Sequence, residues 1–158
     1  MSVSRSTVKD CLYHLKRRHR PATVLPDNNL RDVVKSMLSG QRHRIVYVVD
    51  RSGNLKGCIT LHDLNELIFR HFLARRLSDT IVLSEDIMEI FSSGMASEIM
   101  DTYTPVCHED DSLHKIMEWM MEADCLDMAV LDRNEKFAGA LDVLDLLEQW
   151  LIDGCEVY

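Results

Sequence analysis

Two polar residues in the first half of the chain have the types and spacing of a helix start that binds anions. Thr60 and Asp63 stand three residues apart, where an apolar run gives way to a helical pattern. A threonine followed three residues later by an acidic residue forms a capping box, in which each side chain accepts from the other residue's backbone N–H. A helix start also presents free N–H groups and the positive end of the helix dipole, which suit a phosphate. The structural and the ligand-binding interpretations are compatible.

A second polar group, His43 and Arg44, directly precedes the β-branched run that begins at Ile45. The guanidinium group of arginine matches phosphate oxygens with a planar fork of donors, and histidine adds another donor. The alternative is a solvated basic loop over residues 41–44. His62, beside Asp63, either faces the same anion or lies on the surface, as isolated histidines usually do.

These residues belong to a segment that occurs twice in the chain. Residues 23–64 align with residues 106–146 when one residue is deleted near position 40. The matched pairs include Asp27 with Asp110, Leu30 with Leu113, Asp50 with Asp132, Gly57 with Gly139 and Asp63 with Asp145.

Each copy has the pattern strand–helix–strand–strand–helix, which predicts an α/β fold. The first helix of each copy has apolar residues on one face, and a turn signal separates its two later strands. A unit of about 60 residues is too small to cover its own sheet, so we expect the two copies to pack together. The two apolar faces comprise Leu30, Val33, Val34, Met37 and Leu38 in one copy, and Leu113, Ile116, Met117, Met120 and Met121 in the other.

The second copy departs from the first at its polar positions. Asp142 stands where the first copy has Thr60, and Cys125 and Leu126 replace the His–Arg pair. A carboxylate at this place repels a phosphate, although Asp142 is still a good helix cap. We therefore expect at most one good anion-binding site, built around the first copy.

The repeated unit resembles the cystathionine-β-synthase (CBS) domain, and the tandem resembles a CBS pair, also called a Bateman module. The first copy carries the ending Gly-hydrophobic-hydrophobic-Thr-x-x-Asp over residues 57–63. Its residues 43–50 look like the His-Arg-hydrophobic strand entry of the γ subunit of AMP-activated protein kinase. The resemblance covers roughly residues 8–152. It implies two β-α-β-β-α repeats packed as a pseudo-twofold pair, acting as a regulatory or sensory module rather than as an enzyme.

The resemblance also implies an adenosine-containing ligand, with AMP, ADP or ATP expected in the first copy and Mg²⁺ only alongside ATP. Thr60 would donate to phosphate, Asp63 would accept from the ribose hydroxyls, and three strand residues would line the adenine unless they belong to the ordinary core. The second site would be empty, would take adenosine or S-adenosylmethionine, or would hold a cation between Asp127, Asp142 and Asp145. The expected site residues are Thr23, Val24, His43, Arg44, Val46, Thr60, His62 and Asp63, with Val106, Met128, Asp142 and Asp145 in a weaker second site.

We expect an N-terminal helical segment over residues 1–20, repeats over 21–72 and 99–153, and a helical connector over 73–98. Ser6 or Thr7 is the expected cap of the first helix. Modules of this kind commonly form homodimers and control a partner protein, which stays unidentified here. The competing hypothesis is a ligand-free dimerisation module, and an enzyme is the least supported, because no nucleophile is paired with a base.

Composition and charge further narrow the class of protein to which this chain can belong. The chain has 158 residues, a net charge of −8 and 46% hydrophobic residues, with a net charge of +8 over residues 1–79 and −16 over 80–158. No apolar run approaches the roughly 20 residues of a membrane helix, and no secretory signal is present. Five cysteines without a CxxC pair indicate reduced thiols in a cytoplasmic protein, and no metal motif accompanies them. The basic stretch 16–20 is short beside so much acidic charge, so it favours protein docking over nucleic acid.

Overall fold

The computed structural model describes residues 6–15, 20–39, 43–76, 89, 91–92 and 94–155. The chain divides into two compact units. One unit comprises residues 22–103, and the other combines residues 1–21 with residues 104–158. Most of the expected connector 73–98 lies outside the described residues, as does the basic stretch 16–20 apart from Arg20.

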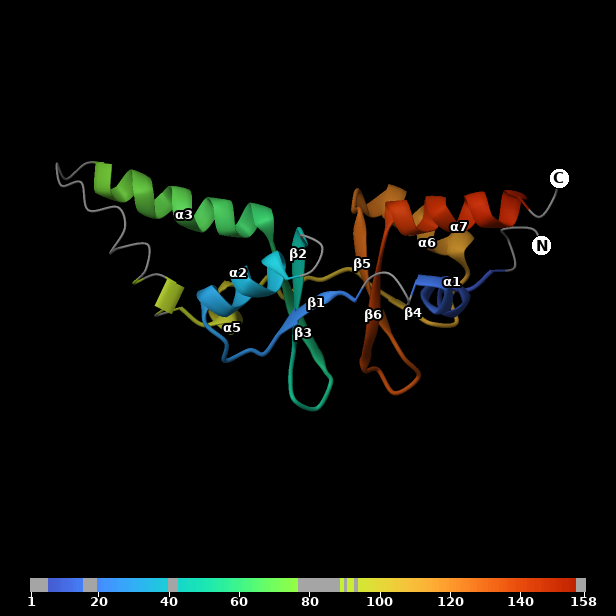
Figure 1. The fold of residues 1–158 in the computed structure, drawn as a ribbon, viewed down its shortest axis with the longest axis horizontal. Coiled ribbons are helices and arrows are strands. Elements are labelled where there is room, and N and C mark those ends of the chain that lie inside the picture. Colours follow the sequence, from blue (N-terminus) through green and yellow to red (C-terminus); the bar gives the residue numbers. More distant parts are fainter. Residues whose placement is uncertain are drawn as a thin grey trace. The chain divides into compact units, whose positions relative to one another are not determined.

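The unit of residues 22–103 contains a three-stranded sheet in the order β1-β2-β3 (Figure 1). Strand β1 (Ala22–Val24) runs parallel to β2 (Ile45–Val49), and β2 runs antiparallel to β3 (Leu55–Thr60). Helix α2 (Leu30–Leu38) connects β1 to β2, and α3 (Leu61–Arg76) follows β3 without a break. The predicted order strand–helix–strand–strand–helix is therefore confirmed for the first repeat.

The second repeat has the same topology. Strand β4 (Val106–His108) is parallel to β5 (Asp127–Leu131), which is antiparallel to β6 (Phe137–Asp142). Helix α6 (Leu113–Ala123) connects β4 to β5, and α7 (Val143–Cys155) follows β6. None of the helices in the described ranges is long and apolar enough to cross a membrane.

A side-chain cap lies at the start of the helix that connects the two parallel strands in each repeat. Asn29 and Asp32 form a capping box at α2, and the Ser112 hydroxyl accepts from the Lys115 N–H at α6. The predicted apolar faces are buried or half-buried except at their last residues. Leu38 and Met121 are exposed. Both lie at the C-terminal ends of their helices, where the chain turns back toward the sheet.

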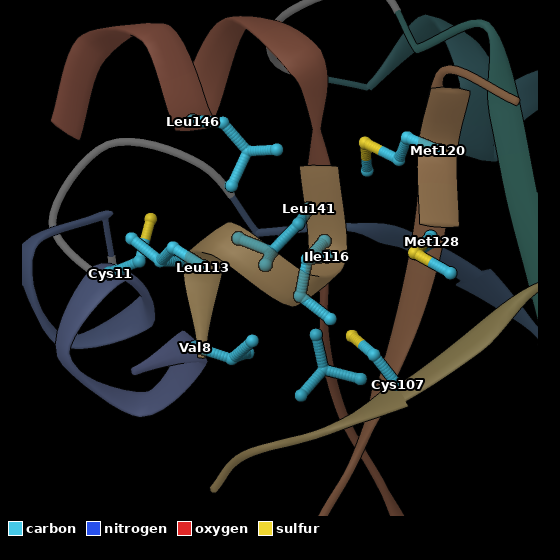
Figure 2. Close-up of a cluster of buried hydrophobic side chains, with 10 residues drawn as sticks. Val8, Cys11, Cys107, Leu113, Ile116, Met120, Met128, Leu141 and Leu146 are labelled. Carbon is cyan, nitrogen blue, oxygen red and sulfur yellow. The ribbon is translucent and has the colours of Figure 1, made fainter. Parts of the chain in front are cut away.

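The core of the second repeat includes an element from the start of the chain. Helix α1 (Val8–Leu15) packs against this repeat, and its Val8 and Cys11 are fully buried among Leu113, Leu141 and Leu146 (Figure 2). Backbone bonds fix the segment, since the Val8 N–H donates to the Asp111 carbonyl over 2.9 Å. The N-terminal helix thus completes a repeat that begins about a hundred residues later in the chain.

The first repeat is completed in the same way, by the segment that precedes the second. Helix α5 (Ala96–Ile99) buries Ala96 in the core of the first repeat, and the Ala96 N–H donates to the Asn28 carbonyl. The Asp101 N–H and carbonyl pair with those of Cys58 on β3. We call residues 94–103 the strap.

The two added segments are themselves repeats of each other, a relation that our alignment of 23–64 with 106–146 left out. Thr7 bridges to Ser112, just as Met95 bridges to the equivalent Asn29. Asp10 accepts from the Thr7 N–H, so Thr7 is the expected cap, and Glu98 accepts from the Met95 N–H. The sequence signal was present in residues 7–12 and 95–100, but it is short.

Candidate ligand-binding site

The capping box at the start of α3 is present. The N–H and the hydroxyl of Thr60 both donate to Oδ2 of Asp63, each over 2.8 Å. The Asp63 N–H donates back to the Thr60 hydroxyl oxygen over 3.2 Å. The structural interpretation of this pair is therefore confirmed, and its role toward a ligand stays a prediction.

The hydrogen bonds of the capping box leave Thr60 and Asp63 with different capacities to bind a ligand. The Thr60 hydroxyl gives its only hydrogen to Asp63, so it reaches a phosphate only by leaving the capping box. Asp63 accepts both bonds through Oδ2, and among the described residues its Oδ1 has no donor. The free oxygen suits a hydroxyl group of a ligand better than Thr60 suits a phosphate.

The backbone of Arg44 is hydrogen-bonded to the start of α3, beside the Thr60–Asp63 capping box. We call this place, where β3 leads into α3, the corner of the first repeat. The Leu61 N–H at the start of α3 donates to the Arg44 carbonyl over 2.8 Å, and the His43 N–H donates to the Met37 carbonyl over 2.8 Å. The Arg44 side chain is exposed, and within the described part of the chain it has no hydrogen-bond or ion-pair partner. Arg44 therefore has its backbone beside a helix start and an uncommitted guanidinium group, and His43, half-buried, precedes it.

His62 is less suited to bind an anion than its position beside Asp63 suggests. Its imidazole Nε2 lies 3.7 Å from Glu66, which also lies 3.6 Å from Arg70. These three side chains form an exposed row one turn apart on α3. The nearby Glu66 carboxylate opposes an anion here.

The three strand residues expected at the adenine point in two directions. Val24 and Val46 are buried in the hydrophobic core of the first repeat, whereas Thr23 is exposed. Successive side chains of a strand alternate between the faces of a sheet, so Thr23 and Val24 cannot line the same surface. The three side chains are therefore not brought together on one face, and their adenine role stays a prediction.

The matching corner of the second repeat has the same backbone and different chemistry. The Asp142 N–H donates to Asp145 and the Asp145 N–H donates to Asp142, each over 2.8 Å. The Val143 N–H donates to the Leu126 carbonyl over 3.1 Å, as Leu61 does to Arg44. Leu126 is 69% exposed, so an apolar side chain takes the place of the guanidinium group.

The other residues expected in the second site also differ in burial, as those of the first site do. Val106 on β4 is exposed, whereas Met128 on β5 is buried in the core. Cys125 is half-buried, and burial together with the Asp127 carboxylate raises the pKa of its thiol. A neutral thiol and a leucine offer no positive charge to a phosphate.

The structure does not support a cation between Asp127, Asp142 and Asp145. Across the described ranges, no three His, Cys, Asp or Glu side chains gather as metal ligands. Asp142 and Asp145 each turn an oxygen toward the other's backbone N–H, which keeps these two carboxylates in a cap. The cation alternative for the second site was therefore wrong for these three residues.

Comparison with known proteins identifies the repeated unit. The family model of the CBS domain matches residues 7–70 and 96–151. Both matches include the segments that pack against the other repeat, α1 in the first and α5 in the second. No curated protein matches this chain.

Solved structures agree on the fold. The CBS domain of a CBS-domain-containing membrane protein from Sphaerobacter thermophilus has a TM-score of 0.71 at 23% identity, covering 93% of this chain and 89% of that one. A CBS-domain-containing protein from Bacillus anthracis has a TM-score of 0.70 at 16% identity, covering 94% of both chains. A CBS-domain protein from Pyrobaculum aerophilum, complexed with AMP, has a TM-score of 0.64 at 15% identity, covering 89% of both.

Proposed function

This chain belongs to the CBS domain family and carries a tandem pair of the domain, and from that premise we propose that it is a regulatory module that binds an adenine nucleotide through its first repeat. AMP, ADP and ATP are the proposed ligands, with Mg²⁺ accompanying only ATP. The bound nucleotide would change the activity of a partner protein. The AMP complex of the Pyrobaculum aerophilum relative supports this ligand class.

The uncommitted Arg44 guanidinium is the observation that carries the proposal. Arg51, Arg70 and Arg133 each lie within ion-pair distance of a carboxylate. Arg44 has none among the described residues, and the Leu61 N–H bond holds its backbone at the start of α3. A phosphate placed there meets a bidentate donor and the positive end of a helix dipole.

Asp63 supplies the second contact of the proposed site. Its Oδ1 is open to a donor, while Oδ2 stays in the capping box. A ribose hydroxyl is such a donor. Thr23 and His43 are proposed at the edge of the site, and Val24 and Val46 shape it from the core side.

Only the first repeat is proposed to bind a phosphate. Leu126 and Asp142 remove the positive charge and add a negative one at the second corner. That corner, with Val106, Met128 and Asp145, is left for adenosine or S-adenosylmethionine, or stays empty.

Thermal unfolding with and without AMP, ADP or ATP tests the proposal. A ligand that binds only the folded state raises its stability by RT ln(1 + [L]/Kd), about 2.7 kcal/mol at a hundredfold excess over Kd. We expect Arg44→Ala to remove the shift and its matched control, Leu126→Ala, to keep it. If no adenosine compound raises the melting temperature at millimolar concentration, the nucleotide proposal is wrong.

Asp63→Ala needs its own control because Asp63 also caps α3. Loss of the cap costs roughly 1 kcal/mol with or without ligand. Asp145→Ala removes the equivalent cap from α7. Both variants should therefore lose stability alike, while Asp63→Ala alone loses the rise in melting temperature with nucleotide. Isothermal titration calorimetry then measures nucleotide binding to each variant directly.

The second candidate function is a dimerisation module without a ligand. The exposed leucines of α7 favour it independently of the nucleotide site. It predicts a homodimer whose stability ignores adenosine compounds. Mass spectrometry of small molecules released from the purified protein separates the two functions, since a tightly held nucleotide is released on denaturation.

A further inference from the structure

Equivalent helices of the two repeats, α2 and α6, carry an exposed apolar residue at the same position. Leu38 lies at the C-terminal end of α2 and is 60% exposed, and Met121 takes its place on α6 and is 83% exposed. The residue before each of them is buried, and Figure 2 shows Met120 in the core of the second repeat. An exposed apolar residue is ordinary by itself, so the charged residues around it decide what the surface can bind.

On α2 the residues that share a face with Leu38 are cations. Arg31, Lys35 and Leu38 follow one another at four and then three residues, which places them on one side of the helix, and all three are exposed. Lys35 has no hydrogen-bond or ion-pair partner among the described residues. The only acid of α2, Asp32, is held in the capping box. We call Arg31, Lys35 and Leu38 the basic surface.

On α6 the equivalent face is acidic. Glu118 stands at the position of Lys35, and Glu122 and Asp124 follow it, all three exposed. Within the described ranges, the Glu122 carboxylate has no hydrogen-bond or ion-pair partner. We call Glu118, Met121, Glu122 and Asp124 the acidic surface.

The cations of α6 do not neutralise the acidic surface. Nζ of Lys115 lies 3.3 Å from Oδ1 of Asp111 and 4.3 Å from the centre of the Trp119 ring, so its charge is already engaged. His114, whose Nε2 lies 3.1 Å from Glu118, adds a positive charge only when it is protonated. Even then the three carboxylates of the acidic surface stay in excess.

We propose that the basic surface of one copy of this chain binds the acidic surface of a second copy. Lys35 then meets Glu118, and Leu38 covers Met121. Both surfaces are exposed within the single chain, and complementary charge favours their encounter. Like-charge repulsion opposes the two alternatives, basic against basic and acidic against acidic. The contact uses neither α7 nor the nucleotide, so it is independent of the proposed function.

Charge reversal in the full chain tests the pairing by sedimentation velocity. Lys35→Glu and Glu118→Lys each place like charges together, and we expect each to raise the dissociation constant of self-association about tenfold or more. An equimolar mixture of the two variants should regain the association, because every contact between the two variants joins an anion to a cation. Lys9→Glu, which reverses an exposed cation of α1, is the control and should change nothing.

Two further measurements follow the same contact. Met121→Ser removes apolar area without changing charge and should also weaken the association. Added NaCl screens the attraction, so the wild-type association should weaken as the salt is raised to about 0.5 M. Circular dichroism confirms that each variant folds, and nucleotide titration of the same samples reports separately on the ligand site.

Three results would overturn the inference. A wild-type chain without concentration-dependent association removes it outright. Single variants that associate as the wild type does assign self-association to other residues. A mixture that associates no more tightly than either variant alone shows that the two surfaces do not meet between copies. Loss of nucleotide binding with the association intact bears on the proposed function and leaves this pairing in place.

Discussion

A Cβ atom on Gly57 would lie 2.6 Å from the carbonyl oxygen of Asp101. The close approach arises because the strap pairs with β3 at the next residue, Cys58. The Cys58 N–H donates to the Asp101 carbonyl over 3.0 Å, and the Asp101 N–H donates to the Cys58 carbonyl over 2.8 Å. Glycine at position 57 thus lets the strap lie directly against the strand that leads to Thr60.

Gly57→Ala should destabilise the protein more than Gly139→Ala. At Gly57 the added methyl group meets backbone, whereas at Gly139 it meets the Leu12 side chain at 3.2 Å, which can move aside. Overpacking against an unyielding group costs about 1–3 kcal/mol, and we expect the Gly139 variant to lose well under that. Urea unfolding followed by circular dichroism measures both, and equal losses would contradict the role given to the strap.

The second corner should gain a phosphate site when it is given the chemistry of the first. Leu126→Arg with Asp142→Thr restores a guanidinium group beside the start of α7 and removes the repelling carboxylate. Calorimetric titration with AMP should then show a second equivalent of bound nucleotide per chain. Leu126→Arg alone, the control, should bind the second equivalent more weakly, because Asp142 stays close. An unchanged stoichiometry in the double variant would mean that other residues decide the asymmetry.

Helix α1 should respond to pH through Asp10. The N–H and hydroxyl of Thr7 both donate to this carboxylate and lower its pKa below the ordinary value. A lowered folded-state pKa stabilises the protein above the unfolded pKa, near 3.9, and the gain is lost as pH falls through the folded value. Asp10→Asn should therefore lower stability at neutral pH and match the wild type at strongly acidic pH. Urea unfolding over a pH series tests this, with Glu122→Gln, an exposed acid on α6, as the control.

The thiols should differ in reactivity according to burial. Burial and the nearby Asp111 raise the pKa of Cys107 to about 12, so its thiolate is scarce at neutral pH. Cys125 also has a raised pKa but is only half-buried. Iodoacetamide labelling followed by peptide mass spectrometry should modify Cys125 first and Cys107 only after unfolding in urea. Labelling of Cys107 at the rate of Cys125 in the folded protein would show that the second core opens readily.

Sequence patterns predicted the parts of this molecule that depend on near neighbours. The order of strands and helices follows from the apolar spacing around Leu30 and Leu113, and both helices have the expected buried faces. The capping box of Thr60 and Asp63 needs only residues three positions apart. Duplication made these signals stronger because each appears twice in register.

Features that depend on distant contacts were harder to predict. The packing of Val8 into the second repeat joins residues more than a hundred positions apart, and no local pattern encodes it. The Thr60 hydroxyl donates its hydrogen to Asp63 because of the direction of the two side chains, which the spacing of residues does not reveal. Likewise, the apolar spacing did not predict that Leu38 and Met121, at the C-terminal ends of their helices, are exposed.

The exchange of α1 and the strap between the repeats has a consequence for synthesis on the ribosome. Chains are made from the N-terminus, and domains usually fold as they emerge. Here Val8 and Cys11 are translated ahead of both repeats, yet the core that buries them is complete only after Leu146 has been added. The first repeat likewise waits for Ala96. The nascent chain must therefore keep α1 uncovered until most of the second repeat is made, so a helix translated ahead of the first repeat is buried only after the second.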